Sequence, residues 1–336
     1  MLQIKKSCKK NLFIPLFIIV SLVMMIMCLC VGRYKLSLTD IWNVIRYGKS
    51  CGDLSAYNVL VHIRLPRILI SYLIGIALSV SGAAYQSLFN NRLISPGILG
   101  VDAGACVGAG ICILLGVGSF GITTVAFVFG LLSAALTLMI QKVARSSSPL
   151  LLVLAGMVVG ALMNSAIGII KYLADGENKL ASLTFWMLGD ISGAEMKQVL
   201  WVLPVVVICT TILLLMGMRL NAISLGEKEA SSLGINYKRN RMIIVCCSTL
   251  LTCMSVSIAG SIDWIGLIIP NIVRSIFGCD NKKIIPYSIL FGGVFMVIVD
   301  TLARTLSPSE IPLGIITGIF GAVVYFFIII GKKGVV

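Results

Sequence analysis

The sequence has 336 residues, of which 58% are hydrophobic and only 12% are charged, and its mean hydropathy is +1.04. This balance excludes a water-soluble globular enzyme or binding domain. In a soluble protein, the net charge of +14 would favour nucleic acid as a partner. In a membrane protein with several spans, it is better explained by Lys and Arg residues that flank the spans on the cytoplasmic side. We therefore expect no nucleic-acid partner.

The eleven cysteines and the single histidine do not form a recognisable site. Most cysteines lie inside apolar runs, no CxxC pair with zinc spacing occurs, and His62 cannot build a metal site alone. We interpret the cysteines as small apolar filler. We expect no catalytic residue, no metal and no cofactor in this chain.

Ten apolar segments can cross a membrane as helices. The first follows four lysines and lacks a small-residue cleavage site, so we interpret it as an uncleaved span with the N-terminus in the cytoplasm. The eighth is short and contains Pro270, which predicts a broken or half-buried helix packed among others. The sequence thus predicts an all-α transmembrane bundle with both termini cytoplasmic, and one domain over residues 1–336. The expected spans are 11–32, 68–89, 97–116, 120–140, 150–170, 199–216, 242–260, 264–278, 284–302 and 313–330.

Two expected external segments contain short amphipathic stretches that favour helices lying on the membrane surface. The first reads TDIWNVIRYG and starts at Thr39, which can cap a helix. The second contains FWMLGD, from Phe185 to Asp190.

The polar loop at about 219–241 is more structured than a simple connector requires. Ser224 and Glu227 have the spacing of a capping box, which predicts a short helix, and Gly234 is suited to end it in a left-handed turn. One interpretation is a solvated connector between two spans. The other is a docking platform for a soluble partner.

Several stretches together resemble one family, the permease subunits of binding-protein-dependent ABC importers for iron chelates, haem and cobalamin. They read RLPRILISYLIGIALSVSGAAYQSLFNNRLISPGILGVDAGA (64–105), LGEKEASSLGI (225–235), GLIIPNIVR (266–274), DTLAR (300–304) and EIPLGIITGIFGA (310–322). The resemblance implies a ten-span homodimer in a bacterial cell membrane, two separate ATP-binding subunits that carry ATP and Mg, an external substrate-binding lipoprotein, and a metal chelate as substrate. The sequence agrees with this division, because no GxxxxGK(S/T) phosphate-binding loop occurs in it.

The resemblance also implies roles for particular residues. The polar loop would couple ATP hydrolysis to transport, through Leu225, Gly226, Glu227, Ala230, Leu233 and Gly234. Arg64, Arg67 and Arg304 would dock acidic residues of the binding protein, although ordinary snorkelling at the membrane edge is the alternative. Ser147, Ser148 and Pro149 fall where the family has its cytoplasmic gate, and a plain turn between helices is the alternative.

Three positions depart from the family pattern. Asn271 stands where the family usually has His, and Asp102 and Asp263 stand where small, hydroxyl or aromatic residues are common. Ionisable residues at membrane depth favour function, but wet helix ends or nearby basic residues also explain them, and we assign them no role.

The favoured function is import of a ferric siderophore driven by ATP on a partner, with haem, cobalamin and molybdate as other cargoes. The alternative is an ion-coupled secondary transporter, which would need polar sites on paired broken helices.

Overall fold

The computed structural model describes residues 13–50, 52–145, 148–174 and 178–331. Within these ranges the chain is helical and contains no strand. Short 3-10 or π segments are η1 (Gly48–Ser50), η2 (Val59–Arg64) and η3 (Pro96–Leu99). The α-helices are α2 (Phe13–Cys30), α3 (Leu38–Tyr47), α4 (Leu54–Asn58), α5 (Leu65–Leu88), α6 (Val101–Leu114), α7 (Ser119–Val143), α8 (Pro149–Leu173), α9 (Lys179–Met187), α10 (Met196–Leu215), α11 (Gly217–Ile223), α12 (Glu227–Ser232), α13 (Tyr237–Ala259), α14 (Ile265–Phe277), α15 (Asn281–Leu306) and α16 (Leu313–Gly331).

The membrane-spanning helices match the expected spans one for one. Six stretches are long and apolar enough to cross a membrane, and the shorter apolar helices α2, α6, α14 and α16 take the remaining positions. One of the long stretches, Leu54–Leu88, is the continuous run of α4, η2 and α5, so this span extends beyond the expected range at its start. The predicted all-α transmembrane bundle is confirmed.

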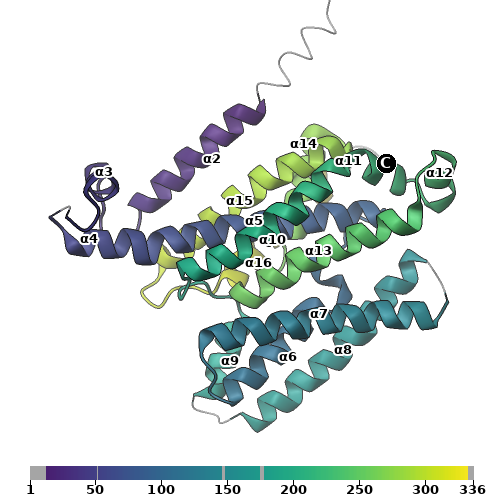
Figure 1. The fold of residues 1–336 in the computed structure, drawn as a ribbon, viewed down its shortest axis with the longest axis horizontal. Helices are drawn as coiled ribbons and strands as arrows, with labels where there is room; N and C mark the ends of the chain where they lie inside the picture. The colour runs from purple at the N-terminus through teal and green to yellow at the C-terminus, as the bar shows by residue number, and fades with distance from the viewer. Residues whose placement is uncertain (1–12, 51, 146–147, 175–177, 332–336) are drawn as a thin grey trace, which may run out of the picture.

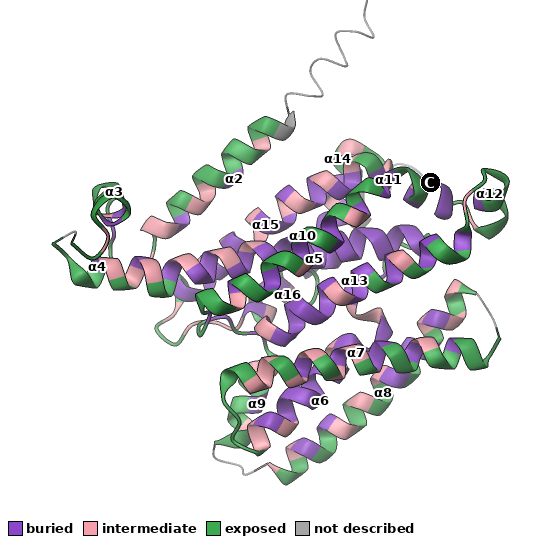
Figure 2. Ribbon diagram, in the orientation of Figure 1, coloured by how far each residue is buried: buried purple, intermediate pink, exposed green. Residues whose placement is uncertain are grey.

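Helix α5 forms the centre of the bundle and contacts α10, α13, α14 and α15. Nearly all of its residues are buried (Figure 2). Its glycines explain the close contacts, because a Cβ added to Gly75 would lie 2.1 Å from the carbonyl oxygen of Gly292 on α15. A Cβ on Gly82 would lie 1.9 Å from the carbonyl oxygen of Gly266 on α14. Small residues thus let the helix backbones come into contact. This close packing stabilises the bundle in a membrane, where the hydrophobic effect does not favour helix association.

Helices α6, α7, α8 and α9 form a second group beside this central bundle (Figure 1). The chain enters this group through a break, because Gly100 adopts a left-handed conformation with φ +75° between η3 and α6. The Ser133 hydroxyl donates to the Gly100 carbonyl at 2.7 Å, and the Thr137 hydroxyl donates to the Leu99 carbonyl at 2.9 Å. The third expected span is therefore broken, with its helix starting at Val101 rather than Gly97.

Helix α14 is the short, buried helix that Pro270 predicted. It begins after a turn at Trp264, whose φ is +74°. Buried polar contacts hold it to α5, because the Arg274 guanidinium donates to the Gln86 side-chain oxygen and the Gln86 amide donates to the Gly266 carbonyl at 3.3 Å. Pairing inside the bundle accounts for a charged residue in this span.

The amphipathic helix expected from residue 39 exists as α3, but Ser37 caps it rather than Thr39. Ser37 and Asp40 form a full capping box, and the Ser37 hydroxyl, 2.6 Å from an Asp40 carboxylate oxygen, lowers the pKa of Asp40. Thr39 offers a capping hydroxyl, but Trp42 stands three residues after it, so only Ser37 with Asp40 fits a capping box.

The second expected surface helix is displaced. Helix α9 starts at Lys179 and ends at Met187, so only the first part of FWMLGD is helical. The remaining residues form a turn at Gly189, with φ +86°, and connect the end of α9 to the end of α13 and the start of α16. Asp190 N–H donates to the Ala259 carbonyl at 3.0 Å, and Leu313 N–H donates to the Gly189 carbonyl at 2.9 Å.

Candidate functional sites at the two ends of the bundle

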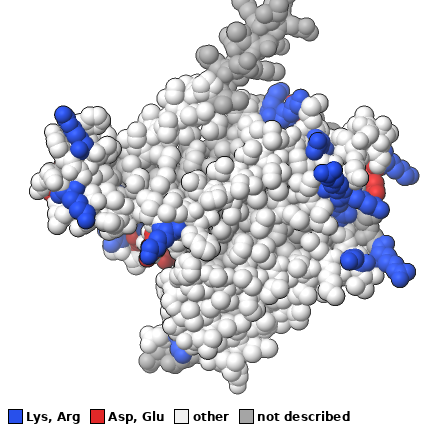
Figure 3. Space-filling view, in the orientation of Figure 1, with Lys and Arg blue, Asp and Glu red and all other residues white. Residues whose placement is uncertain are grey.

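Charged side chains gather at the two ends of the helices and leave an uncharged band between them on the side shown in Figure 3. One end carries α11, α12 and the start of α13, and we call it the α12 face (Figure 1). The opposite end carries α3 and α4, and we call it the α3 face. This distribution fits a slab of hydrocarbon with charged groups in the water on both sides.

Helix α12 is a short platform that presents two exposed leucines. Leu225 and Leu233, which flank the helix, are 63% and 62% exposed. Ala230 lies on the inner side, is fully buried, and belongs to the main hydrophobic core. Its burial leaves Ala230 no surface to offer a partner, so it can serve the platform only from inside, and the coupling role of the loop stays a prediction.

The start of α12 differs from the prediction, whereas its end agrees with it. The expected capping box is absent, because Ser224 donates to the Asn221 carbonyl at 2.7 Å and still belongs to the end of α11. Gly226 precedes the helix with φ +115°, a conformation that favours glycine. At the other end the prediction is confirmed, because Gly234 has φ +75° and Ile235 N–H donates back to the Ala230 carbonyl at 3.0 Å.

A polar clamp fixes the base of this platform to α15. The Asn221 side chain donates to an Asp280 carboxylate oxygen at 2.8 Å and accepts from Asn281 N–H at 2.8 Å. The Asn221 hydrogen bond lowers the pKa of Asp280 below its usual range. Asn281 in turn accepts from the Ser87 hydroxyl at 2.7 Å, so the clamp reaches the end of α5. The platform is therefore attached to the central helix of the bundle.

The arginines expected to dock a binding protein are buried at the α3 face. The Arg67 guanidinium donates to Asp300 at 2.7 Å and to Glu310 at 2.9 Å, and its side chain is 6% exposed. Arg64 donates to the carbonyls of Leu29, Cys30 and Tyr34, and Arg304 donates to the Cys28 carbonyl. The three guanidiniums are thus occupied by partners inside the chain, and their docking role stays a prediction.

Other cations of the α3 face are exposed, and no sequence motif marked them. Arg33 donates to the Ser307 carbonyl at 2.9 Å and remains exposed, and Lys35 and Arg46, in the last turn of α3, are exposed as well. These residues directly follow the first span or lie in the amphipathic helix after it, and that position in the sequence could have predicted their exposure.

The proposed gate lies partly outside the described residues, because Ser147 is not among them. Ser148 is the N-cap residue of α8, and Pro149 occupies its first turn. That position explains Pro149, because the missing N–H is not needed there and the fixed φ suits a helix start. The gate itself stays a prediction.

The three departures from the family pattern lie in different environments. Asn271 is buried, and its amide donates to the Leu267 carbonyl at 2.8 Å and the Arg92 carbonyl at 3.0 Å, so it joins elements of the bundle. Asp102 is half-buried in the first turn of α6, and Asp263 is exposed in the turn before α14. Among the described residues, no group of three or more His, Cys, Asp or Glu could hold a metal ion.

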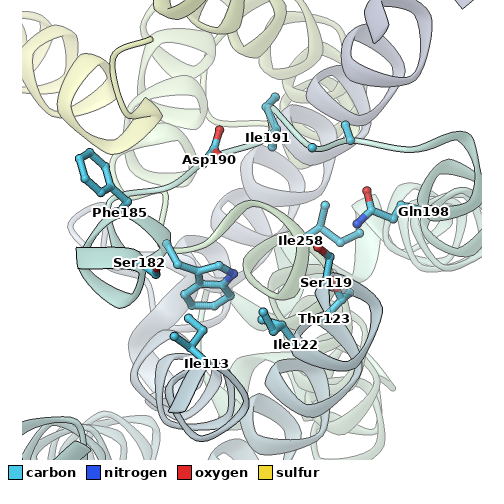
Figure 4. Close-up of a pocket in the computed structure, with 13 residues that line it drawn as sticks. Ile113, Ser119, Ile122, Thr123, Ser182, Phe185, Asp190, Ile191, Gln198 and Ile258 are labelled. Atoms are coloured by element: carbon cyan, nitrogen blue, oxygen red, sulfur yellow. The ribbon is translucent and has the colours of Figure 1, made fainter. Parts of the chain in front are cut away.

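A cavity of about 270 Å³ lies near the α3 face between α7, α9 and α10. Its wall combines Ile113, Ile122 and Ile258 with the carboxylate of Asp190 and the amide of Gln198 (Figure 4). The polar groups in the wall and the small volume suit ordered water better than a metal chelate.

Comparison with known proteins agrees with this architecture. The chain is 35% identical over 295 residues to the molybdate import system permease protein MolB of Haemophilus influenzae, covering 87% of each chain. It is 31% identical over 310 residues to the hemin transport system permease protein HmuU of Yersinia pestis, covering 90% of each chain. A solved inward-facing structure of a metal-chelate type ABC transporter superposes with a TM-score of 0.87 at 32% identity, covering 96% of this chain and 99% of that one.

These relatives are permeases of ABC importers, and none of them supports the ion-coupled alternative. The sequence profile of the FecCD transport family matches residues 18–332, which is nearly the whole chain. The chain therefore belongs to the FecCD transport family and is a transport permease subunit rather than an enzyme.

Proposed function

We propose that this chain is the membrane subunit of an ATP-driven importer of metal chelates, with a ferric siderophore as the first candidate. The match to the family over residues 18–332 carries this proposal. Two copies of the chain would enclose the substrate path, as one domain each. Two ATP-binding subunits would hold ATP and Mg, and a substrate-binding lipoprotein would deliver the chelate from outside.

The orientation follows from the α12 platform and from the terminal charges. We assign the α12 face to the cytoplasm of a bacterial cell, because ATP is there, and because the N-terminal lysines favour that side. Leu225 and Leu233 are the exposed apolar groups that an ATPase groove would cover, while Glu227 supplies a rim charge. Gly226 and Gly234 shape the platform ends, and Ala230 supports it from inside.

The α3 face would then dock the binding protein. We propose that Arg64, Arg67 and Arg304 act here by holding the end of α2, the start of α5 and the loop after α15 in one arrangement. Exposed cations such as Arg33 would make the direct contacts with acidic groups of the partner.

The coupling role of the platform is tested by two charge substitutions with a matched control. We expect Leu225→Asp and Leu233→Asp to abolish co-purification of the ATP-binding subunit and uptake, because each places a charge in an apolar contact without disturbing the core. Leu306→Asp is the control, since Leu306 is 65% exposed but lies at the opposite face. Normal ATPase capture by both platform variants would remove α12 from the coupling role.

The cargo is tested by growth of a strain that lacks this chain on ferric siderophores, haem, cobalamin under auxotrophy, and limiting molybdate. Failure on a siderophore, restored by the intact chain and not by Leu225→Asp, is the expected result. Failure only on molybdate would replace the chelate with an oxyanion and leave the importer assignment intact. Normal growth on every source would contradict the proposed cargoes.

A further inference from the structure

A cavity of about 660 Å³ opens at the α12 face between the end of α7 and the start of α13. Figure 1 shows the two helices diverging toward this end, although they are in contact elsewhere along their length. Neither the platform leucines nor the arginines of the α3 face line this cavity. The transport function proposed above therefore leaves it unexplained.

Basic side chains surround the mouth of the cavity. Lys142 and Arg145 come from the end of α7, and Lys238 comes from the first turn of α13, all three exposed. Arg241 lies deeper, is buried, and also interacts electrostatically with Tyr237 and Glu227. Among the described residues, no Asp or Glu lines the cavity. The three exposed cations alone therefore create a site for a negatively charged group.

The wall behind these cations is apolar. Ala135, Met139 and Met242 line it and are exposed, so their side chains face the hydrocarbon rather than the core. Ala135 is seven residues before Lys142, which places the apolar wall about 10 Å below the basic mouth, at 1.5 Å per helical residue. Cations at the water boundary above an open apolar groove match the order of headgroup and acyl chain in a phospholipid.

We propose that this cavity binds an anionic glycerophospholipid of the cytoplasmic leaflet, with its phosphate held by Lys142, Arg145 and Lys238 and its acyl chain along Met139 and Met242. The proposal uses the cytoplasmic assignment of the α12 face. Basic pockets between helices on the cytoplasmic side are typical sites for such headgroups. A soluble anion would gain nothing from the apolar wall, whereas a lipid uses both parts. Because Lys238 lies in the same loop as α12, a bound lipid would also hold the coupling platform against the end of α7.

The test measures lipid retained by the purified full-length permease with its ATP-binding subunit, using native mass spectrometry with added phosphatidylglycerol or phosphatidylcholine. We expect preferential retention of phosphatidylglycerol by the unaltered protein. Each exposed lysine near a membrane surface raises the affinity for an anionic lipid about fivefold, so Lys142→Gln with Lys238→Gln should lower retention about 25-fold. The matched control is Lys282→Gln with Lys283→Gln, which removes two lysines from the same face away from the cavity.

A second variant separates the lipid from a free anion. Ala135→Trp fills the groove without removing a cation, so we expect it to reduce phosphatidylglycerol retention while leaving the basic mouth unchanged. Equal loss in both lysine pairs would mean general surface attraction and would overturn the proposal. Full retention by Ala135→Trp, together with displacement of the lipid by millimolar inorganic phosphate, would indicate a soluble anion instead. Retention is measured without transport, so a negative result leaves the importer function standing.

Discussion

Arg67 acts as a brace, and its removal should cost stability. The side chain pairs with Asp300, which is fully buried, and with Glu310. We expect Arg67→Met to lower the free energy of unfolding by about 3–5 kcal/mol, because it leaves a buried carboxylate without its main partner. Arg67→Met with Asp300→Leu should recover part of that loss. Thermal unfolding of the detergent-purified chain measures both variants.

The same variants distinguish a brace from a docking residue. An unchanged unfolding midpoint for Arg67→Met, with weaker capture of the binding protein, would show that Arg67 grips the partner directly. Arg33→Met should show the opposite pattern to a brace, an unchanged unfolding midpoint with weaker capture of the binding protein, since Arg33 is exposed and its hydrogen bonds go to the Ser307 and Pro308 carbonyls.

Sequence patterns located these arginines but could not place their guanidiniums. RLPR and DTLAR marked the correct end of the bundle, yet the partners of Arg67 lie 233 and 243 residues away along the chain. Long-range pairing of this kind leaves no local periodicity or spacing to read. Burial of a charge can be anticipated only when its partner is known.

The clamp between α11 and α15 should control the order of the coupling platform. Asn221→Ala removes the hydrogen bond that lowers the pKa of Asp280. We expect a loss of about 1 kcal/mol, reduced from the usual value for a charged partner because Asp280 is partly exposed. Amide hydrogen exchange across α11 and α12 should therefore rise about fivefold at pH 7.

The pH dependence of this effect has a definite sign. A carboxylate with a lowered pKa in the folded state contributes stability above its unfolded pKa of about 4, and this contribution disappears as the pH falls through the folded value. The difference in amide hydrogen exchange across α11 and α12 between Asn221→Ala and the unaltered chain should therefore become smaller at low pH. The difference between Asp280→Asn and the same protein with Asn221→Ala added should not change with pH, because residue 280 then carries no charge. Equal differences at pH 7 and at low pH would contradict the charged clamp.

At the scale of elements, sequence reasoning succeeded where a local conformational need was strong. Gly234 ends α12 because a left-handed residue is required there, and Pro270 marked the short helix α14. It failed at Ser224, where the capping pattern matched but the chain still belonged to the preceding helix. A two-residue pattern does not show whether its first residue ends the preceding helix or caps the following one.

For the whole molecule, hydropathy predicted the ten spans because the bilayer requires apolar helices of nearly fixed length. The break at Gly100 and the displaced α9 escaped prediction, since both depend on contacts with other helices. The partners and the substrate path could be inferred only through family resemblance. An apolar helix face that contacts lipid has the same kind of sequence as one that contacts a second copy of the chain.

Exposed polar side chains can distinguish those two surroundings. Asn164, on the outward side of α8, and Asp263, in the turn before α14, are exposed at membrane depth, where contact with lipid would be costly. If two copies enclose a wet path, Asn164→Cys and Asp263→Cys should react with a charged, membrane-impermeant thiol reagent in a background without the native cysteines. Ile208→Cys on α10 is the control, because Ile208 is 59% exposed on a helix that carries no charged residue after Lys197. Equal protection of all three thiols would place α8 against lipid and contradict a path between two copies along this face.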